Sequence, residues 1–228
     1  MIRTLTLCIA ILLGSIGLTH AQTKVACVGD SITAGVRIPK KKRATHSYPA
    51  VLNQLLGDQY KVMNLGVSGH TLLRDEKLAW AKHKNAQELK TFVPDIIVFK
   101  LGTNDSKMAH WVNKGKVEGD LKVFIAEFKA INPKVKIYLC LPAPCFKGPR
   151  TKELRDGEKI SGVRIKEELI PIIQKVAKEE SLPVIDLNTP FVDHPELFAD
   201  GCHPNEEGAS QIAKIVFEKI SGNKKDSK

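Results

Sequence analysis

The stretch VACVGDSITAG, residues 25–35, contains the feature that decides the fold. A short apolar run ends at Gly29 and passes directly into Asp30 and Ser31, and Gly35 follows. An apolar run of this length next to glycine and polar residues predicts a buried β-strand that ends in a turn. The serine at that turn is either a turn residue or a nucleophile, and the rest of the chain has to decide between them.

Four further apolar runs, rich in valine, isoleucine and leucine, follow along the chain. None alternates cleanly between apolar and polar residues, which is the pattern of strands covered on both faces in a parallel sheet. Helix-like segments separate the runs, so the sequence predicts an α/β fold with right-handed crossovers and helices on both faces of the sheet. The predicted strands lie in residues 24–29, 60–66, 95–102, 134–142 and 182–188, and the predicted helical segments in residues 47–57, 85–93, 117–131, 163–180 and 205–220.

The two ends of the chain differ in composition from the part between them. Residues 1–21 carry Arg3, then an apolar run, then small residues, which predicts a cleaved secretory signal. The run is short for a membrane span, so we expect no stable membrane insertion after cleavage; an uncleaved anchor is the alternative. Residues 22–220 have the length of one domain, and residues 221–228 form a polar tail. The mature protein is therefore expected to be secreted or periplasmic.

The chain is basic, with a formal net charge of +10 at pH 7. A basic surface favours anionic surroundings such as acidic polysaccharide, cell envelope or nucleic acid. Export argues against nucleic acid, and the sequence has no recognition-helix, zinc-finger or aromatic RNA-binding signature. Part of the charge lies in the loop from Lys40 to Arg43, soon after the serine turn. This loop is either a solvated charged segment or part of the functional site.

Four cysteines remain beyond the signal segment. Cys27 and Cys140 lie in predicted strands and are expected to be small core residues. Cys145 and Cys202 fall in loops, where an oxidising compartment would permit a disulfide; the sequence leaves this pairing open. The sequence has no CxxC zinc pattern and its other histidines show no ligand spacing, so we expect no metal.

Polar, glycine-containing segments follow four of the five predicted strands. In an open parallel sheet, ligands bind outside the carboxyl ends of the strands, so these segments are expected to meet at one edge. Ser31 follows the first strand, Gly69 the second, Asn104 the third, and Asp200 with His203 the fifth.

These residues supply the parts of a serine hydrolase. A serine becomes a nucleophile when a base takes its proton and nearby donors stabilise the resulting oxyanion. Asp200 and His203 are three residues apart, a spacing that makes side chains neighbours on one helical turn, so the carboxylate can orient the imidazole that activates Ser31. The expected oxyanion donors are the backbone N–H groups of Ser31 and Gly69 and the side-chain amide of Asn104. For Ser31 taken alone, a helix N-cap is the alternative.

The motifs GDSI, NLGVSG, GTND and DGCH, in this order, resemble the four blocks of the SGNH hydrolase superfamily, also called GDSL esterases and lipases. The resemblance covers residues 25–220 and implies a flavodoxin-like three-layer sandwich with a five-stranded parallel sheet. Isoleucine at position 32 stands where the family name has leucine. The resemblance assigns the catalytic serine, the oxyanion glycine and asparagine, and the Asp–His pair to Ser31, Gly69, Asn104, Asp200 and His203.

The expected reaction is hydrolysis of an O-acetyl ester on a carbohydrate, without a cofactor. Export, the low aromatic content of 6% and the lack of a long apolar segment suited to a fatty chain favour a glycan. The segments GTNDS and LFADGCHPNEEGASQIA also resemble the bacterial carbohydrate O-acetylesterases, which implies an acetylated glycan as the partner. A lysophospholipase, arylesterase or thioesterase acting through the same residues is the alternative, followed by a non-catalytic glycan-binding protein.

Four residues beside these motifs have secondary roles. Asp30 and Asp105 are expected to shape their turns by hydrogen bonds to backbone amides. His70 either touches the substrate or is an ordinary loop histidine. Trp111 either stacks on a sugar ring or packs against its own loop.

Overall fold

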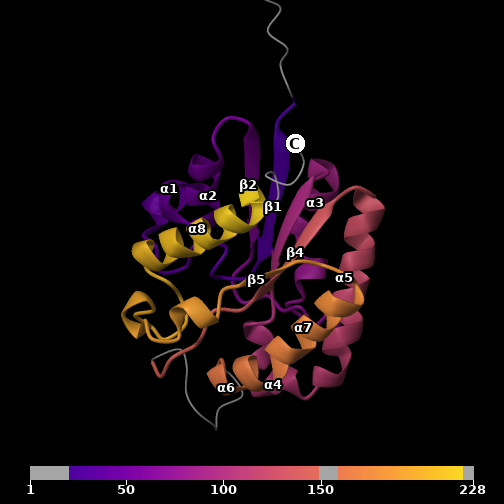
Figure 1. Cartoon of the computed structure of the whole chain (residues 1–228). Helices are drawn as coiled ribbons and strands as arrows, with labels where there is room; N and C mark the ends of the chain where they lie inside the picture. Colours follow the sequence, from indigo (N-terminus) through magenta and orange to yellow (C-terminus); the bar gives the residue numbers. More distant parts are fainter. Residues whose placement is uncertain (1–20, 149–158, 223–228) are drawn as a thin grey trace, which may run out of the picture.

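A five-stranded parallel sheet lies between two layers of helices in the computed structural model, which describes residues 21–148 and 159–222 (Figure 1). The strand order is β2-β1-β3-β4-β5, and every neighbouring pair is parallel. The predicted flavodoxin-like α/β sandwich is therefore confirmed. The strands are β1 (Thr23–Gly29), β2 (Tyr60–Gly66), β3 (Ile96–Lys100), β4 (Lys136–Leu141) and β5 (Val184–Asp186).

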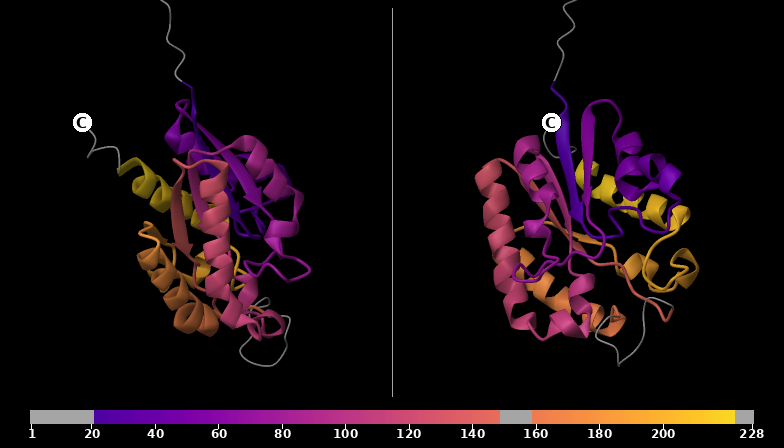
Figure 2. Two further views of the ribbon diagram at one scale, coloured as in Figure 1. Left: turned by 90° about the vertical axis from the view of Figure 1, so that its right-hand side faces the viewer. Right: turned by 180° about the vertical axis from the view of Figure 1, so that it is seen from behind.

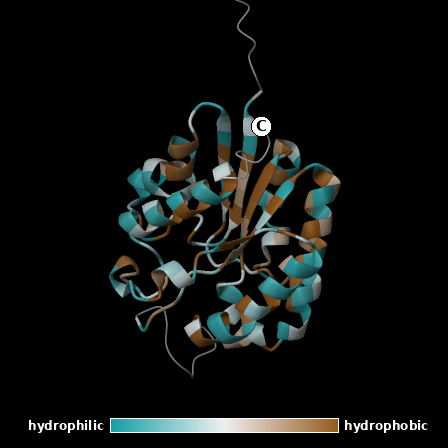
Figure 3. Ribbon diagram, viewed as in Figure 1, coloured by the Kyte–Doolittle hydropathy of each residue, from teal (hydrophilic) through white to brown (hydrophobic). Residues whose placement is uncertain are grey.

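Successive side chains of each strand enter two separate hydrophobic cores. In β1, Val25 and Cys27 belong to one core, whereas Ala26 and Val28 belong to the other. All four side chains are fully buried. Burial of both faces explains why the strands are nearly continuous apolar runs instead of alternating ones. Figure 3 shows the apolar strands in the interior and the polar residues on the outer faces of the helices.

The helices divide between the two faces of the sheet (Figure 2). Helices α2 (Tyr48–Leu56) and α8 (Glu206–Gly222) pack on one face and on each other. Helices α3 (Lys84–Phe92), α5 (Val117–Ile131) and α7 (Ile170–Glu179) cover the opposite face. The five predicted helical segments are thus confirmed, although the helical path before α7 consists of α6 (Gly162–Arg164) and a π-helical turn (Ile165–Leu169).

The basic segment after the serine turn contains short helical turns, whereas the sequence indicated a loop. A 3₁₀ turn covers Lys40–Lys42 and α1 covers Arg43–His46. Pro39 precedes them, and its carbonyl accepts a hydrogen bond of 2.7 Å from the backbone N–H of Lys42. Pro39 is the N-cap of this turn and has an extended backbone, with a ψ of 132°, so the turn begins only at Lys40.

The predicted secretory signal covers residues 1–21, of which only Ala21 is among the described residues. Residues 223–228 of the predicted polar tail also lie outside the described residues. Signal and domain boundaries therefore stay predictions. Residues 221 and 222 belong to α8, so the helix continues two residues into the segment expected to be polar tail. None of the helices that the structure describes is long and apolar enough to cross a membrane.

Gly66 tests how tightly the sheet supports the serine turn. A Cβ at this position would meet backbone atoms of Thr33 and Ala34. Because that backbone belongs to the turn that carries Ser31, Gly66→Ala is expected to lower the free energy of unfolding by about 2–3 kcal/mol. The control is Gly119→Ala on the exposed side of α5, where an added Cβ meets nothing within 4 Å; it is expected to stabilise by about 0.5–1 kcal/mol. Chemical denaturation measures both, and equal effects would contradict the close approach.

Candidate active site

Ser31 lies in the turn that leaves β1 at the carboxyl edge of the sheet. Two backbone hydrogen bonds close this turn, from Val36 N–H to the Ser31 carbonyl at 2.9 Å and from Ala34 N–H to the Asp30 carbonyl at 3.0 Å. Gly35 completes it with a φ of +76°, in the left-handed region that favours glycine. The turn therefore fixes the Ser31 side chain by its backbone, and that side chain is buried.

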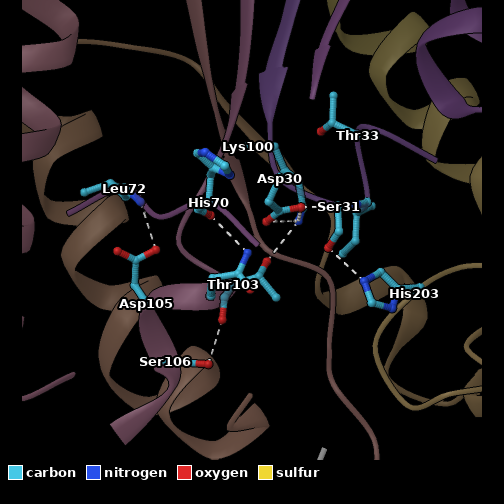
Figure 4. A network of polar contacts seen from close by, with 12 residues as sticks. Asp30, Ser31, Thr33, His70, Leu72, Lys100, Thr103, Asp105, Ser106 and His203 are labelled. Carbon is cyan, nitrogen blue, oxygen red and sulfur yellow. Dashed lines mark hydrogen bonds and ion pairs between the residues drawn. The ribbon is translucent and has the colours of Figure 1, made fainter. Parts of the chain in front are cut away.

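Ser31, His203 and Asp200 form one line of hydrogen bonds, as the sequence predicted. The Ser31 Oγ lies 2.8 Å from His203 Nε2, although the two residues are 172 positions apart in the chain (Figure 4). On the other side of the ring, His203 Nδ1 lies 2.8 Å from Asp200 Oδ2. This geometry allows the imidazole to take the serine proton while the carboxylate holds the ring.

The Asp200–His203 pair lies in a turn before α8, not on the helical turn that we expected. Asp200 Oδ1 accepts hydrogen bonds from the backbone N–H groups of Cys202, at 3.1 Å, and His203, at 2.8 Å. Gly201 between them has a φ of +84°. An aspartate that accepts bonds from the following amides folds the chain into a tight turn, and this brings the two side chains together at the same spacing.

Asp200 is set up to stay ionised. Burial raises its pKa, but hydrogen bonds from the backbone N–H and ring of His203 and from the backbone N–H of Cys202 outweigh burial and leave the pKa below its usual range. A permanent carboxylate next to the imidazole stabilises the positive charge that develops when the ring takes a proton. The electrostatics of the pair therefore fit a general base at His203.

The expected oxyanion donors lie on two loops that contact each other. Gly69, with a φ of +80°, lies beyond β2 in a loop that also holds His70. The Asn104 Nδ2 donates to the His70 carbonyl at 3.0 Å, which fixes the amide and leaves its second N–H for a ligand. Within the described part of the chain, the backbone N–H groups of Ser31 and Gly69 have no acceptor. The three groups are thus free to donate to a ligand, and their role as oxyanion donors stays a prediction.

Asp105 joins the loop that carries Asn104 to the loop that carries Gly69 by hydrogen bonds, as the sequence indicated. One carboxylate oxygen accepts a hydrogen bond from the backbone N–H of Leu72 at 2.9 Å (Figure 4). The other accepts from the backbone N–H of Leu73 at 2.8 Å. The side chain is fully buried. Burial outweighs these hydrogen bonds and raises the pKa of Asp105 to about 6.

Lys100 is the residue of the site that the sequence did not reveal. It is the last residue of β3, and its side chain is fully buried. Its ammonium donates to both carboxylate oxygens of Asp30, at 3.0 and 2.9 Å, and to Thr103 Oγ1 at 2.9 Å. Asp30 in turn accepts from Ile32 N–H at 3.0 Å, which confirms its predicted role in the turn. The lysine therefore joins the serine turn to the loop before Asn104, and a lysine within an apolar strand was the available signal.

Trp111 packs inside the protein and does not face a sugar-binding surface. Its side chain is 5% exposed and belongs to the core that α5 and α7 share. The indole N–H donates to Glu168 Oε2 at 3.2 Å. Of the two predicted roles, packing is therefore the one observed, although Trp111 packs into this core and not only against its own loop. His70 also has protein partners, since its Nδ1 lies 3.0 Å from the Ser68 carbonyl and its ring contacts that of His83 edge to face.

The four cysteines of the described residues are free thiols. Cys27 and Cys140 are buried in the core, as expected. Cys145 and Cys202 lie within hydrogen-bonding distance but are not joined by a disulfide; this hydrogen bond and burial raise the pKa of the Cys202 thiol. No cluster of three or more histidine, cysteine, aspartate or glutamate side chains suited to a metal ion occurs in residues 21–148 or 159–222.

Lys100→Met tests the buried ion pair. The variant leaves the Asp30 carboxylate buried without a counter-charge, so we expect the free energy of unfolding to fall by about 3–5 kcal/mol. The matched control is the double variant Asp30→Asn/Lys100→Met, which removes both charges and is expected to recover part of this loss. Urea denaturation measures both variants. A double variant that is no more stable than the single one would show that the buried charges do not depend on each other.

Asp105 predicts a pH dependence of stability. Its pKa rises from the ordinary value of 3.8 to about 6 on folding, so the folded state holds the proton more tightly than the unfolded state. The stability of the wild type relative to Asp105→Asn should therefore decrease by about 3 kcal/mol as the pH rises from about 4 to about 6, and stay constant above. Denaturation curves of both proteins across this range measure the difference. A constant difference would disprove the raised pKa.

Comparison with known proteins agrees with this site. The GDSL-like lipase/acylhydrolase family model matches residues 27–210. An acetylxylan esterase of Xylanibacter ruminicola is 36% identical over 214 residues, which cover 85% of this chain and 42% of that protein. The chain thus spans less than half of that relative's length. An arylesterase of Vibrio mimicus is 25% identical over 228 residues, with 96% of this chain and 98% of that protein covered.

The fold also has solved counterparts. The structure of the acetyl xylan esterase AlAXEase superposes with a TM-score of 0.66 at 23% sequence identity, covering 86% of this chain and 99% of that one. At this identity the similarity concerns the fold. The family match covers residues 27–210, which contain Ser31, Asn104 and His203, and it assigns the chain to a family. The chain belongs to the GDSL-like lipase/acylhydrolase family.

Proposed function

We propose that the protein is a carboxylic ester hydrolase that removes acetyl groups from a glycan. The observation that carries the proposal is the 2.8 Å contact between Ser31 Oγ and His203 Nε2, because it pairs an alcohol with the base that would activate it. The Asp200 carboxylate behind the ring completes the arrangement. Membership in an acylhydrolase family supports the same reaction.

The reaction would proceed in two steps. His203 takes the Ser31 proton as the serine oxygen attacks the ester carbonyl, and then donates that proton to the departing sugar oxygen. The N–H groups of Ser31 and Gly69 and the free N–H of Asn104 would stabilise the oxyanion of each tetrahedral intermediate. Water, deprotonated by His203, then attacks the acyl-enzyme, and His203 returns that proton to the Ser31 oxygen as acetate leaves. All of these groups belong to this chain.

A relative and the sequence both support an acetylated carbohydrate as the substrate. The acetylxylan esterase of Xylanibacter ruminicola is the most similar of the relatives described above. The predicted signal in residues 1–21 supports a secreted or periplasmic enzyme, where polysaccharides are accessible. The arylesterase of Vibrio mimicus, which matches over nearly its whole length, favours an aryl ester as the second candidate substrate.

Ser31→Ala tests the reaction and its nucleophile together. We expect kcat for p-nitrophenyl acetate to fall by about 10,000-fold or more, because loss of the serine removes the acyl-enzyme route. The matched control is Ser210→Ala on α8, which should retain wild-type activity and a wild-type denaturation curve. A fully active Ser31→Ala protein would rule out the proposed nucleophile.

The substrate class is tested separately, with the wild-type protein. Acetate release from acetylated xylan and a preference for p-nitrophenyl acetate over longer acyl esters are the expected results. Hydrolysis of octanoyl esters in preference to acetyl esters would reject the acetylesterase. Activity on phenyl acetate without acetate release from any polysaccharide would favour the arylesterase.

A further inference from the structure

A basic segment runs alongside the residues that carry the Asp–His pair. At one end, Arg37 Nε lies 3.5 Å from Asp200 Oδ2, and at the other, Lys42 Nζ lies 2.9 Å from Glu206 Oε1. His46 also approaches Glu206, with 3.6 Å between Nε2 and Oε2. These contacts place the segment from Arg37 to His46 beside the segment from Asp200 to Glu206, so its positive charge begins next to the Asp200 carboxylate.

Arg37 has an unusual backbone conformation for its residue type. Its φ is +78°, in the left-handed region that a non-glycine residue rarely adopts. Such a conformation costs on the order of 1 kcal/mol and persists only where the surrounding structure imposes it. The turn does so through hydrogen bonds from Val36 N–H to the Ser31 carbonyl, at 2.9 Å, and from Ile38 N–H to the Gly35 carbonyl, at 3.2 Å. The turn that positions the serine therefore also directs Arg37 towards Asp200.

The Arg37 guanidinium has donors to spare. The contact with Asp200 Oδ2 runs from its Nε at 3.5 Å, a distance that is long for a hydrogen bond. In the part of the chain that the structure describes, its two Nη atoms have no acceptor, and the side chain is 51% exposed. Asp200 does not depend on Arg37, since it already accepts bonds from Cys202 and His203. The fork of Nη groups is free to bind an oxyanion with two hydrogen bonds.

The charges around Arg37 favour an anion. Lys40 and Lys41 are exposed, and neither forms an ion pair within residues 21–148 and 159–222. The acidic groups that pair with this segment are Asp200 and Glu206, and Glu206 is already engaged by Lys42. The excess of positive charge next to the Ser31 turn raises the local concentration of anionic ligands. Some exposed lysines elsewhere are paired with an acidic side chain, such as Lys122 with Glu118 on α5.

We propose that Arg37 is a substrate-binding residue that takes an anionic group, a carboxylate or a sulfate ester, on the glycan whose acetyl group is hydrolysed at Ser31. Lys40 and Lys41 increase the rate of encounter without fixing the position of the anion. This inference rests on the proposed function and narrows the substrate class to acetylated acidic polysaccharides. It gives the basic segment, which the sequence left open, a role in substrate choice.

The test compares matched substrates. One pair is acetylated glucuronoxylan and the same polymer after reduction of its carboxyl groups; the other is an acetylated sulfated galactan and its desulfated form, all brought to the same degree of acetylation. For the wild type at low ionic strength, kcat/KM for acetate release should be about 10-fold or more higher on the anionic member of at least one pair, because bonds to a charged group contribute this much. The pair that shows the preference distinguishes carboxylate from sulfate.

Arg37→Gln should reduce this preference to nearly one, chiefly through KM. Because Arg37 also approaches Asp200, each value is divided by the activity on p-nitrophenyl acetate, which carries no anionic group. The control is Lys214→Gln on the exposed side of α8, which removes the same charge far from Ser31 and should retain the preference. Lys40→Gln/Lys41→Gln should lower the preference only at low ionic strength, since steering by exposed charges is screened by salt.

Three outcomes would overturn the inference. The first is equal kcat/KM within both substrate pairs, and the second is an Arg37→Gln protein that keeps the preference. The third is a wild type that hydrolyses p-nitrophenyl acetate but releases acetate from none of the four polymers, which would also reject the glycan substrate while leaving the esterase reaction intact. A wild type that does not hydrolyse p-nitrophenyl acetate would instead reject the proposed function itself.

Discussion

The buried contact between Asp30 and Lys100 fixes the positions on which the rest of the site depends. β1 and β3 are neighbours, and their register pairs Gly29 with Lys100, so the residue after β1 meets the last side chain of β3. Both side chains are fully buried, and a buried charge that lost its partner would cost several kcal/mol. The two loops therefore cannot move apart independently. Ser31 follows Asp30, and Lys100 also holds Thr103 next to Asn104, so one ion pair locates both the proposed nucleophile and a proposed oxyanion donor.

The contact between Ser31 and His203 needs a second constraint, because its own hydrogen bond is weak. A hydrogen bond contributes about 1 kcal/mol net, which is small compared with the entropy lost by ordering the loops that carry it. The packing of α8 on α2 supplies the remaining free energy that orders these loops. Ile212 and Val216 of α8 and Leu52 of α2 are fully buried in the same core, and α8 begins three residues after His203. The packed helix thus fixes the position of the His203 imidazole next to Ser31.

Local signals allowed much of this to be predicted. The bounds of β2 and α5 match the predicted residues 60–66 and 117–131, because an apolar run or a helical stripe is visible without its partners. A lysine within an apolar strand signals a buried charge, but the sequence does not identify its partner, because Asp30 is 70 residues away. The spacing correctly predicted that the side chains of Asp200 and His203 meet, but it indicated a helical turn where the structure has an aspartate turn. Both kinds of turn bring residues three apart close together.

The structure separates the groups that would perform the reaction from those that would choose the substrate. Ser31, Asn104 and His203 are buried, and each is hydrogen-bonded to another group of the protein, so their positions are fixed from within the fold. Arg37 belongs to the same turn, but its side chain is half exposed and lies 3.5 Å from the Asp200 carboxylate. A replacement there would alter the charge offered to a substrate without disturbing the sheet. In the proposed enzyme, the same constrained turn would therefore keep the chemistry constant while the segment that follows it would select the substrate.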